Sequence, residues 1–129
     1  MDRVRFITHQ GKQVLLLDYH NLADEAEMLE MIDERKELVN AQPKGSVLTI
    51  ADVTNARFSK NVLTRIKEAN VLDLPFVRRS ALVGVDPSQE AAVQAVDTFA
   101  HRHWKRFATV AEALDWIVSD EAEAEGRAR

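Results

Sequence analysis

The sequence predicts a single α/β domain with a mostly parallel central sheet, packed helices and an antiparallel strand at the N-terminal edge. The first reason is length, since 129 residues make one ordinary domain. The second is the alternation of strand-like and helix-like segments, which is typical of a parallel sheet covered by helices. The third is the Gln10-Gly11 turn between the first two strand-like segments, which favours a hairpin. The expected order is β-β-α-β-α-β-α-β-α.

The N-terminal hairpin and a long helix make up the first part of the chain. Residues 3–9 alternate in character as a half-buried strand does. Residues 12–19 contain the continuous apolar run Val14-Leu15-Leu16-Leu17, which is typical of a strand covered on both faces. Residues 22–42 then form a helix, with Asn21 as its expected N-cap and acidic residues in its first turns.

The middle of the chain continues with a strand, a helix and another strand. Residues 46–54 are apolar enough for a third strand, and residues 59–72 carry their apolar side chains on one side of a second helix. Pro75 closes that helix, because proline cannot continue it. Residues 77–85 are the expected fourth strand.

The third helix has the strongest start signal in the sequence. Asp86 can cap it, Pro87 takes the first helical position, and Gln89 takes the capping-box position. A short strand follows at residues 105–107. A second capping box, Thr109-Val110-Ala111-Glu112, opens a last helix that extends to residue 118.

The C-terminal sequence SDEAEAEGRAR loses apolar content from residue 119 onward. Such a composition is typical of a disordered acidic tail. We therefore expect one folded domain at residues 1–118 and a disordered tail at residues 119–129.

Composition excludes several classes of protein. Hydrophobic residues make up 46% and charged residues 29%, with four Gly and three Pro, so disordered and low-complexity classes do not fit. The absence of cysteine excludes disulfide scaffolds, thiolate nucleophiles and thiolate metal sites. No apolar run approaches the about 20 residues of a membrane span, no hydrophobic signal segment opens the chain, and the net charge is −4. We expect a cytoplasmic protein without a transmembrane segment or a nucleic-acid partner.

Two passages of the sequence resemble a known family. They are Val47-Leu48-Thr49-Ile50-Ala51-Asp52-Val53-Thr54-Asn55-Ala56-Arg57-Phe58 and Phe107-Ala108-Thr109-Val110-Ala111-Glu112-Ala113-Leu114-Asp115-Trp116. Together with the element order, they resemble the anti-sigma-factor-antagonist-like, or STAS-like, small bacterial domains over residues 3–118. That fold is also related to the CRAL-TRIO lipid-carrier domains. The resemblance implies a non-enzymatic module that acts through protein contacts.

The chain departs from this family at the phosphorylation motif. Anti-sigma-factor antagonists carry an Asp-Ser-Ser-Gly type motif after the third strand, whereas this chain has Phe58-Ser59-Lys60-Asn61-Val62. Ser59 stands just before a helix, where serine is a preferred N-cap. We therefore interpret Ser59 as a cap rather than a phosphoacceptor.

The loop after the third strand is the expected binding surface. Asp52 is expected to hold the turn at Thr54-Asn55 through loop amides, and Phe58 can pack as a hydrophobic staple on the next helix. The candidate partner-binding or ligand-binding residues are Asp52, Thr54, Asn55, Arg57, Phe58, Ser59 and, in the first long helix, Arg35.

Arg35 stands out because it interrupts the apolar stripe of the helix at residues 22–42. Two interpretations remain open. Its stem can pack while the guanidinium reaches solvent at the edge, or the guanidinium can make a bidentate contact with a carboxylate.

The sequence offers little for catalysis. Asp18, Asp52 and Asp86 end three expected strands, where α/β proteins place active sites, but each also fits a turn or cap. The four histidines lack zinc-binding spacing, and serine-hydrolase, P-loop and dinucleotide motifs are absent. We expect no enzyme, cofactor or metal site, with a hydrolase on Asp18 or Asp52 as the outlying alternative.

The charges are segregated along the chain. Residues 20–40 contain seven acids and two bases, whereas residues 57–79 contain six bases and two acids. These two regions could pair between two copies and steer homodimer formation, could contact anionic headgroups, or could be solvated helix faces.

We therefore predict a STAS-like binding and regulatory module that lacks the usual phosphoserine motif. Its partner is a second copy or another protein. The alternative is a small carrier or sensor of a nonpolar ligand such as a fatty acid or lipid, which requires an apolar cavity between helix and sheet.

Overall fold

The computed structural model describes residues 2–127, and their side chains as far as residue 123. The described elements follow the expected order, with an additional helix at the C-terminal end. They are β1 (Val4–His9), β2 (Lys12–Asp18), α1 (Glu25–Asn40), β3 (Val47–Asp52), α2 (Lys60–Asp73), β4 (Val77–Val83), the 3-10 turn η1 (Pro87–Gln89), α3 (Glu90–Ala100), β5 (Lys105–Phe107), α4 (Val110–Ile117) and α5 (Asp120–Arg127).

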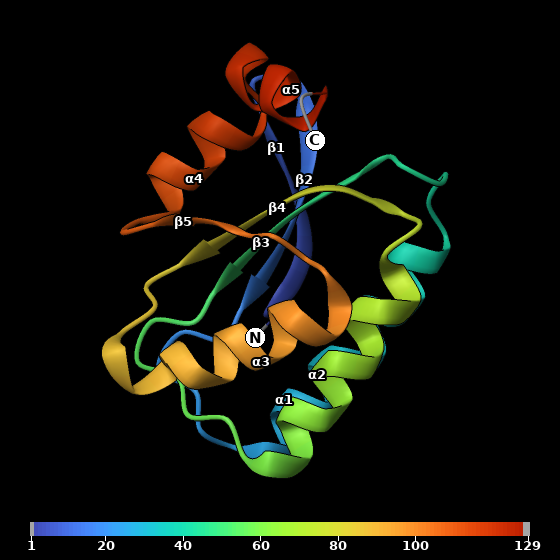
Figure 1. Cartoon of the computed structure of the whole chain (residues 1–129). Helices are drawn as coiled ribbons and strands as arrows, with labels where there is room; N and C mark the ends of the chain where they lie inside the picture. The colour runs from blue at the N-terminus through green and yellow to red at the C-terminus, as the bar shows by residue number, and fades with distance from the viewer. Residues whose placement is uncertain (1, 128–129) are drawn as a thin grey trace.

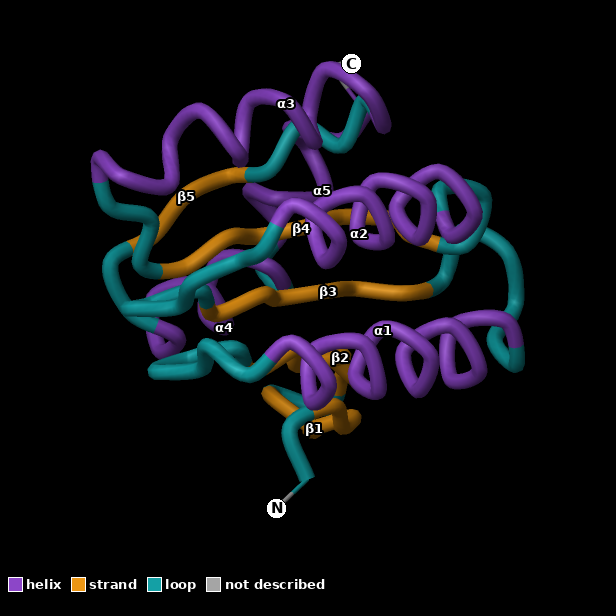
Figure 2. The backbone as a smooth tube through the Cα atoms, turned by 90° about the horizontal axis from the view of Figure 1, so that it is seen from below, coloured by secondary structure: helices purple, strands orange, loops and turns teal. Residues whose placement is uncertain are grey.

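The sheet has five strands in the order β1-β2-β3-β4-β5. Strand β1 pairs antiparallel with β2, and the remaining neighbours pair in parallel. The predicted α/β class, the mixed sheet and its antiparallel N-terminal edge are therefore confirmed. Helices α1, α2 and α3 lie on one face of the sheet and α4 lies on the other (Figures 1 and 2).

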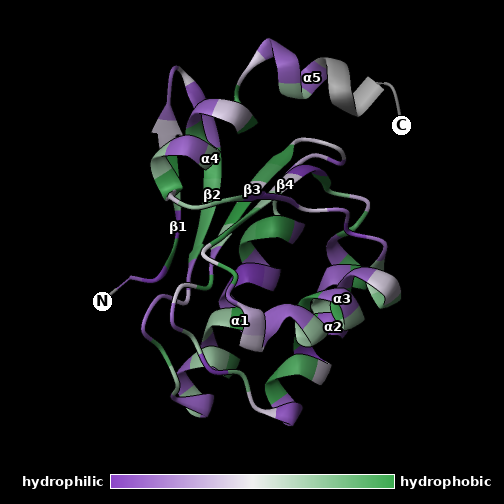
Figure 3. Ribbon diagram, turned by 60° about the vertical axis from the view of Figure 1, so that its left-hand side comes forward, coloured by the Kyte–Doolittle hydropathy of each residue, from purple (hydrophilic) through white to green (hydrophobic). Residues whose placement is uncertain are grey.

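Both faces of the sheet are buried, as the apolar run in β2 predicts. Leu15 and Leu17 belong to the core under α1 and α2, whereas Val14 and Leu16 belong to the core under α4. Side chains alternate between the two faces of a strand, so four consecutive apolar residues supply two cores. Figure 3 shows the resulting hydrophobic strands between more polar helical surfaces.

The start of the first helix differs from the prediction. Its N-cap is Asp24, whose side chain accepts a hydrogen bond from the Glu27 amide at 2.9 Å, and not Asn21. Asn21 instead adopts a left-handed conformation with φ of 57°, and its amide donates to the Thr54 carbonyl at 2.9 Å. Asn21 therefore joins its own loop to the loop after β3 and does not cap the helix. The helix begins at Glu25, three residues after the predicted start.

The expected disordered tail is also corrected, because Asp120–Arg127 forms helix α5. Ser119 Oγ accepts from the Ala122 amide at 3.1 Å, and Ala122 is buried. The Glu123 carboxylate pairs with Arg78 and Arg79 of β4. Composition alone misses this helix because its stabilising partners come from a distant strand. Residues 128–129 of the expected tail lie outside the described part of the chain.

Candidate functional site

Three connecting loops meet at the carboxyl ends of β2, β3 and β4 (Figure 1). They comprise residues 19–24, 53–59 and 84–86. In open α/β sheets this edge is where binding sites gather, because loops from several strands converge there. The candidate residues Asp52 to Ser59 all lie in or beside the middle loop.

Short polar contacts hold the loop after β3 from within. Asp52 Oδ1 accepts from the Thr54 amide at 3.0 Å and from Thr54 Oγ1 at 2.6 Å. Asn55 has a φ of 55°, and its Nδ2 donates to Asn21 Oδ1 at 3.0 Å. Asp52 thus holds the turn as expected, while the pairing of two left-handed asparagines joins this loop to the β2–α1 loop.

The sequence missed the role of Gln89 in this loop. As predicted, its backbone and side chain complete a capping box with Asp86. Its Nε2 also donates to the Val53 carbonyl at 2.8 Å and to the Ala56 carbonyl at 3.0 Å. Gln89 is buried, so these bonds satisfy loop carbonyls that water does not reach. A glutamine at a capping-box position gives no local signal of such distant acceptors.

Four candidate side chains are exposed on the rigid loop: Thr54, Asn55, Arg57 and Ser59. We call them the loop surface. The Arg57 amide donates to the Leu22 carbonyl at 3.0 Å, so the backbone is fixed even where the side chain is free to reach a partner. The structure therefore brings most of the candidate residues together on one exposed surface.

Ser59 caps α2, as predicted. Its Oγ accepts from the Val62 amide at 3.1 Å and lies 2.6 Å from Glu25 Oε1, to which it donates. The hydroxyl therefore joins the first turns of α1 and α2. Both hydrogen-bonding capacities of Ser59 are used within the chain.

Phe58 points inward from the loop surface. Its ring makes an edge contact with buried Tyr19, with the ring centroids 5.4 Å apart and the planes at 67°. Phe58 and Leu63 both line the cavity below. Phe58 is thus a packing residue between the loop and the interior.

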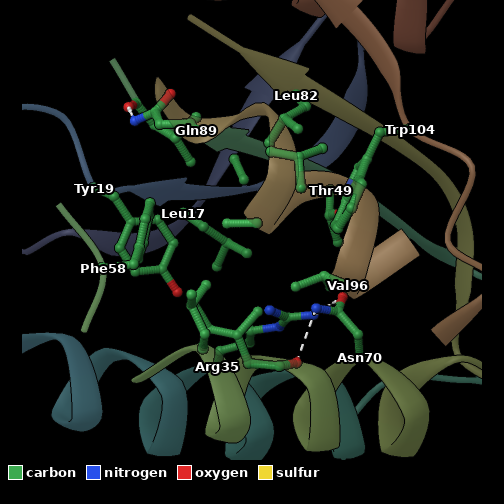
Figure 4. A pocket seen from close by; sticks show the side chains of 16 residues that line it. Leu17, Tyr19, Arg35, Thr49, Phe58, Asn70, Leu82, Gln89, Val96 and Trp104 are labelled. Atoms are coloured by element: carbon green, nitrogen blue, oxygen red, sulfur yellow. Dashed lines mark hydrogen bonds between the residues drawn. The ribbon is translucent and has the colours of Figure 1, made fainter. Parts of the chain in front are cut away.

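A cavity of about 70 Å³ lies between the sheet and helices α1, α2 and α3. Figure 4 shows Tyr19 and Phe58 on one side, Trp104 on the other, and Arg35 on the helical side. The lining is mostly apolar, with a few polar side chains. It comprises Leu17, Tyr19, Arg35, Thr49, Ala51, Val53, Phe58, Leu63, Ile66, Asn70, Leu82, Gln89, Ala92, Val93, Val96 and Trp104.

Arg35 lies in this interior and not on the loop surface. It is only 5% exposed; its Nε donates to Asp73 Oδ2 at 2.9 Å and its Nη2 to Asn70 Oδ1 at 2.8 Å. Arg102 joins them, with Nη2 donating to the Asn70 carbonyl at 2.9 Å and to Asp73 Oδ1 at 3.3 Å. The contact with a carboxylate is the correct interpretation of Arg35, and the solvent-reaching interpretation is wrong.

Burial governs the electrostatics of this interior. It raises the pKa of Tyr19, an effect that the Arg35 guanidinium opposes. Burial also lowers the pKa of Arg102 to about 10, against the stabilising charge of Asp73 and with a further decrease from Arg35. At neutral pH the phenol is therefore neutral and the Arg102 guanidinium is charged. The sequence missed Asn70, Asp73 and Arg102, although an arginine in an apolar stripe signals that a buried partner is needed.

The other strand-end acids have local roles. Asp18 Oδ1 accepts from the His20 amide at 3.2 Å, and Asp86 caps η1. Among the side chains that the structure describes, at residues 2–123, no three from aspartate, glutamate or histidine lie close enough together to hold a metal ion. Within residues 2–127, no helix has both the length and the apolarity that crossing a membrane requires.

The segregated charges meet partly within the chain. Arg65 of α2, in the basic region, pairs with Asp33 of α1, in the acidic region, at 3.0 Å. The acidic and basic regions lie on neighbouring helices. Some of the complementarity expected across a homodimer is therefore used inside one copy.

Comparison with known proteins shows a likeness in fold. No family model matches the chain, and no curated protein matches it significantly. A solved structure of an anti-sigma-factor antagonist (STAS) domain protein from Planctomyces limnophilus is similar with a TM-score of 0.54. The two sequences are 20% identical, and the alignment covers 90% of this chain and 98% of that chain. The chain therefore has a STAS-like fold, as the sequence resemblance implied.

Replacing Gly84 by Ala tests the close contact that positions the loop surface. Gly84 has a φ of 79°, and an added Cβ would lie 1.9 Å from Thr54 Oγ1. Gly11 is a matched control with a φ of 78° and no atom within 4 Å of such a Cβ. In urea unfolding, Gly11→Ala should cost about 1–2 kcal/mol for the left-handed backbone, and Gly84→Ala about 1–3 kcal/mol more for overpacking. Equal costs would show that the contact is relaxed.

Replacing Asp73 by Asn tests the buried cluster. The change leaves Arg35 and Arg102 facing each other without a carboxylate, so we expect a loss of about 3–5 kcal/mol in the free energy of unfolding. Asp33→Asn breaks the exposed pair with Arg65 and should cost less than about 1 kcal/mol. Chemical denaturation of both variants measures the difference. Similar small losses would mean that the buried pair contributes little.

Ser59 variants test the bridge between α1 and α2. Ser59→Ala should lower the free energy of unfolding by about 0.5–2 kcal/mol, because a cap is lost. Ser59→Asp should restore the cap but place a second carboxylate beside Glu25, so it should be less stable than wild type. In a Glu25→Gln background that penalty should disappear. If Ser59→Asp is equally stable in both backgrounds, the carboxylates do not meet. Urea titration of the four proteins provides the comparison.

Proposed function

We propose that the protein is a non-enzymatic binding and regulatory module that acts through protein contacts on the loop surface, without the usual phosphoserine switch. The observation that carries this proposal is the rigid, exposed loop after β3. Its backbone is held by Asn21, Asp52 and Gln89, while the side chains of Thr54, Asn55, Arg57 and Ser59 are exposed.

A preorganised loop suits protein recognition. Ordering a flexible segment on binding reduces affinity, and a segment that is already fixed avoids that cost. Polar side chains around an arginine can supply hydrogen bonds and a charge-assisted contact to a partner. The similar solved protein is described as an anti-sigma-factor antagonist domain protein, which supports regulation through protein contacts for a chain of this fold.

The environment of Ser59 supports a role without phosphorylation. Its hydroxyl lies against the Glu25 carboxylate at 2.6 Å. A phosphate at this position would carry about −1.5 to −2 charges and would repel a neighbouring carboxylate. The start of a helix favours a negative charge, but the repulsion between a phosphate on Ser59 and the Glu25 carboxylate would offset that stabilisation.

The strand-end carboxylates support a binding role over hydrolysis. Asp52 Oδ1 accepts two hydrogen bonds from Thr54, and Asp18 Oδ1 accepts from the amide of the neighbouring His20. Each carboxylate has a local role in its loop. This accounts for their positions without a catalytic function.

Carriage of a nonpolar ligand is the second candidate function, and the cavity under the helices is the observation that favours it. Its volume of about 70 Å³ is well below the roughly 300–1,000 Å³ of usual small-molecule sites. A fatty acid or lipid would require the helices to move apart. Protein binding therefore remains the first proposal.

Reversing the charge of Arg57 tests the loop surface. We expect Arg57→Glu to abolish the binding of protein partners that wild type captures from extracts of its own host, as measured by affinity capture and mass spectrometry. The matched control is Lys44→Glu, an equal charge change at an exposed residue on the opposite edge of the sheet, which should capture the same partners as wild type. Unchanged capture by Arg57→Glu would contradict the proposed surface.

A homodimer remains one form of the proposed protein contact. If the exposed acids of α1 and bases of α2 also pair between copies, sedimentation at low ionic strength should show a dimer that dissociates as salt is added, because salt screens exposed charges. The pair Asp33–Arg65 is already formed within the chain, so Glu30, Glu34 and Glu37 would supply the remaining acidic surface. A monomer at low and high salt would exclude this dimer.

A further inference from the structure

The buried cluster below the sheet carries more positive than negative charge. Arg35 and Arg102 are 5% and 7% exposed, and Asp73, which they share, is 4% exposed. The arrangement thus sets two guanidinium groups, which stay protonated in proteins, against one carboxylate. A buried charge without full compensation is energetically unfavourable, so the interior is suited to a further anion.

The surrounding groups compensate only part of this excess. Burial raises the pKa of Tyr19, so its phenol does not supply a negative charge. Asn70 contributes a neutral amide to Arg35 and a backbone carbonyl to Arg102. That carbonyl belongs to the last turn of α2, whose helix dipole contributes at most about half a negative charge. A net positive charge remains beside the cavity.

Arg35 is the member of the pair that lines the cavity. It shares the lining with the Asn70 amide and the Tyr19 ring, while the rest of the wall is largely aliphatic and aromatic (Figure 4). A guanidinium at one wall of an apolar space recognises an anionic group attached to a nonpolar chain. The neutral phenol and amide can add hydrogen bonds.

We propose that this cavity binds a short-chain carboxylate, with the carboxylate beside Arg35 and the short apolar chain between Phe58 and Trp104. The inference goes beyond the proposed function, since it holds whether or not the loop surface binds a protein. It also differs from lipid carriage in the size of ligand and in the requirement for a negative charge.

The size of the cavity sets the length of the ligand. A volume of about 70 Å³ is about five to seven times what one water requires. It therefore accommodates about five to seven non-hydrogen atoms, on the same basis. Butyrate falls within this range and is a suitable probe, whereas a long-chain fatty acid does not.

We place the entry for the ligand at the surface beside the loop. A shallow hollow lined in part by Asn55, Arg57 and Asp86 shares three lining residues with the cavity, namely Phe58, Gln89 and Ala92. Phe58 belongs to the loop after β3, and Gln89 donates to two carbonyls of that loop. A ligand that enters here passes directly beneath the loop surface.

The chain contains an internal control for a binding experiment. Trp104 lines the cavity, whereas Trp116 packs against the other core, on the far face of the sheet. In NMR spectra of the full-length protein, butyrate should shift the Trp104 indole signal saturably and leave the Trp116 signal in place. We expect a Kd of the order of 1 mM or tighter. Butyramide, which is neutral and similar in shape, should bind at least about tenfold more weakly.

Two variants test separately whether butyrate binding needs the Arg35 charge and whether it needs the open volume of the cavity. Arg35→Gln leaves Asp73 paired with Arg102, so the cluster becomes neutral without an orphaned ion; it should weaken butyrate binding at least about tenfold and remove the preference over butyramide. Ala92→Leu, at the mouth of the cavity, should block binding while Arg35 stays in place. Ala91→Leu, at an exposed position on the same helix, should bind as wild type does.

Three outcomes would overturn the inference. They are an unmoved Trp104 signal in wild type, equal affinity for butyrate and butyramide, and undiminished butyrate binding by Ala92→Leu. The Trp116 signal reports whether the Arg35→Gln protein is folded. If that signal stays at its wild-type position and the variant still prefers butyrate over butyramide, Arg35 does not select the anion. Thermal unfolding of each variant with and without butyrate gives a second readout, because a ligand that binds only the folded state raises its stability.

Discussion

The buried contact of Arg35 with Asp73 is the interaction on which the helical layer most depends. It joins α1 to α2, and Arg102 adds the segment after α3 to the same carboxylate. All three side chains are removed from water, so the loss of the shared Asp73 carboxylate would leave two uncompensated guanidinium groups in the interior. The cluster therefore fixes how the three helices lie on the sheet, and its placement leaves a cationic wall beside the cavity.

The loop surface and the cavity are two sides of one structural unit. Phe58 stands between the exposed residues Arg57 and Ser59, yet its ring packs on Tyr19 in the interior. Gln89 holds the loop carbonyls and also lines the cavity. A change in the occupancy of the cavity would therefore act on the residues that support the loop. Such an arrangement links a small ligand to a protein-binding surface through packed side chains rather than through a flexible hinge.

Local signals predicted much of the fold and part of the candidate site. Ser59 and Asp86 cap their helices and Asp52 holds its turn as expected, because each bond spans only two or three residues. Asn21 was misjudged as a cap because its true partner, the loop containing Thr54, lies more than thirty residues away. The helix after Ser119 was missed for a similar reason, since Glu123 pairs with arginines of β4.

The sequence by itself determined the order of elements, the mixed sheet and which residues lie in the loop after β3. It could do so because apolar periodicity, caps and turns are local properties. It also marked Arg35 as exceptional without naming its partner. Only the tertiary structure decided that Asp73, Asn70 and Arg102 surround that arginine, that Gln89 holds the loop, and that a cavity remains between them. These contacts join residues far apart in sequence, and their pairing follows from how helices pack on the sheet, which no local pattern encodes.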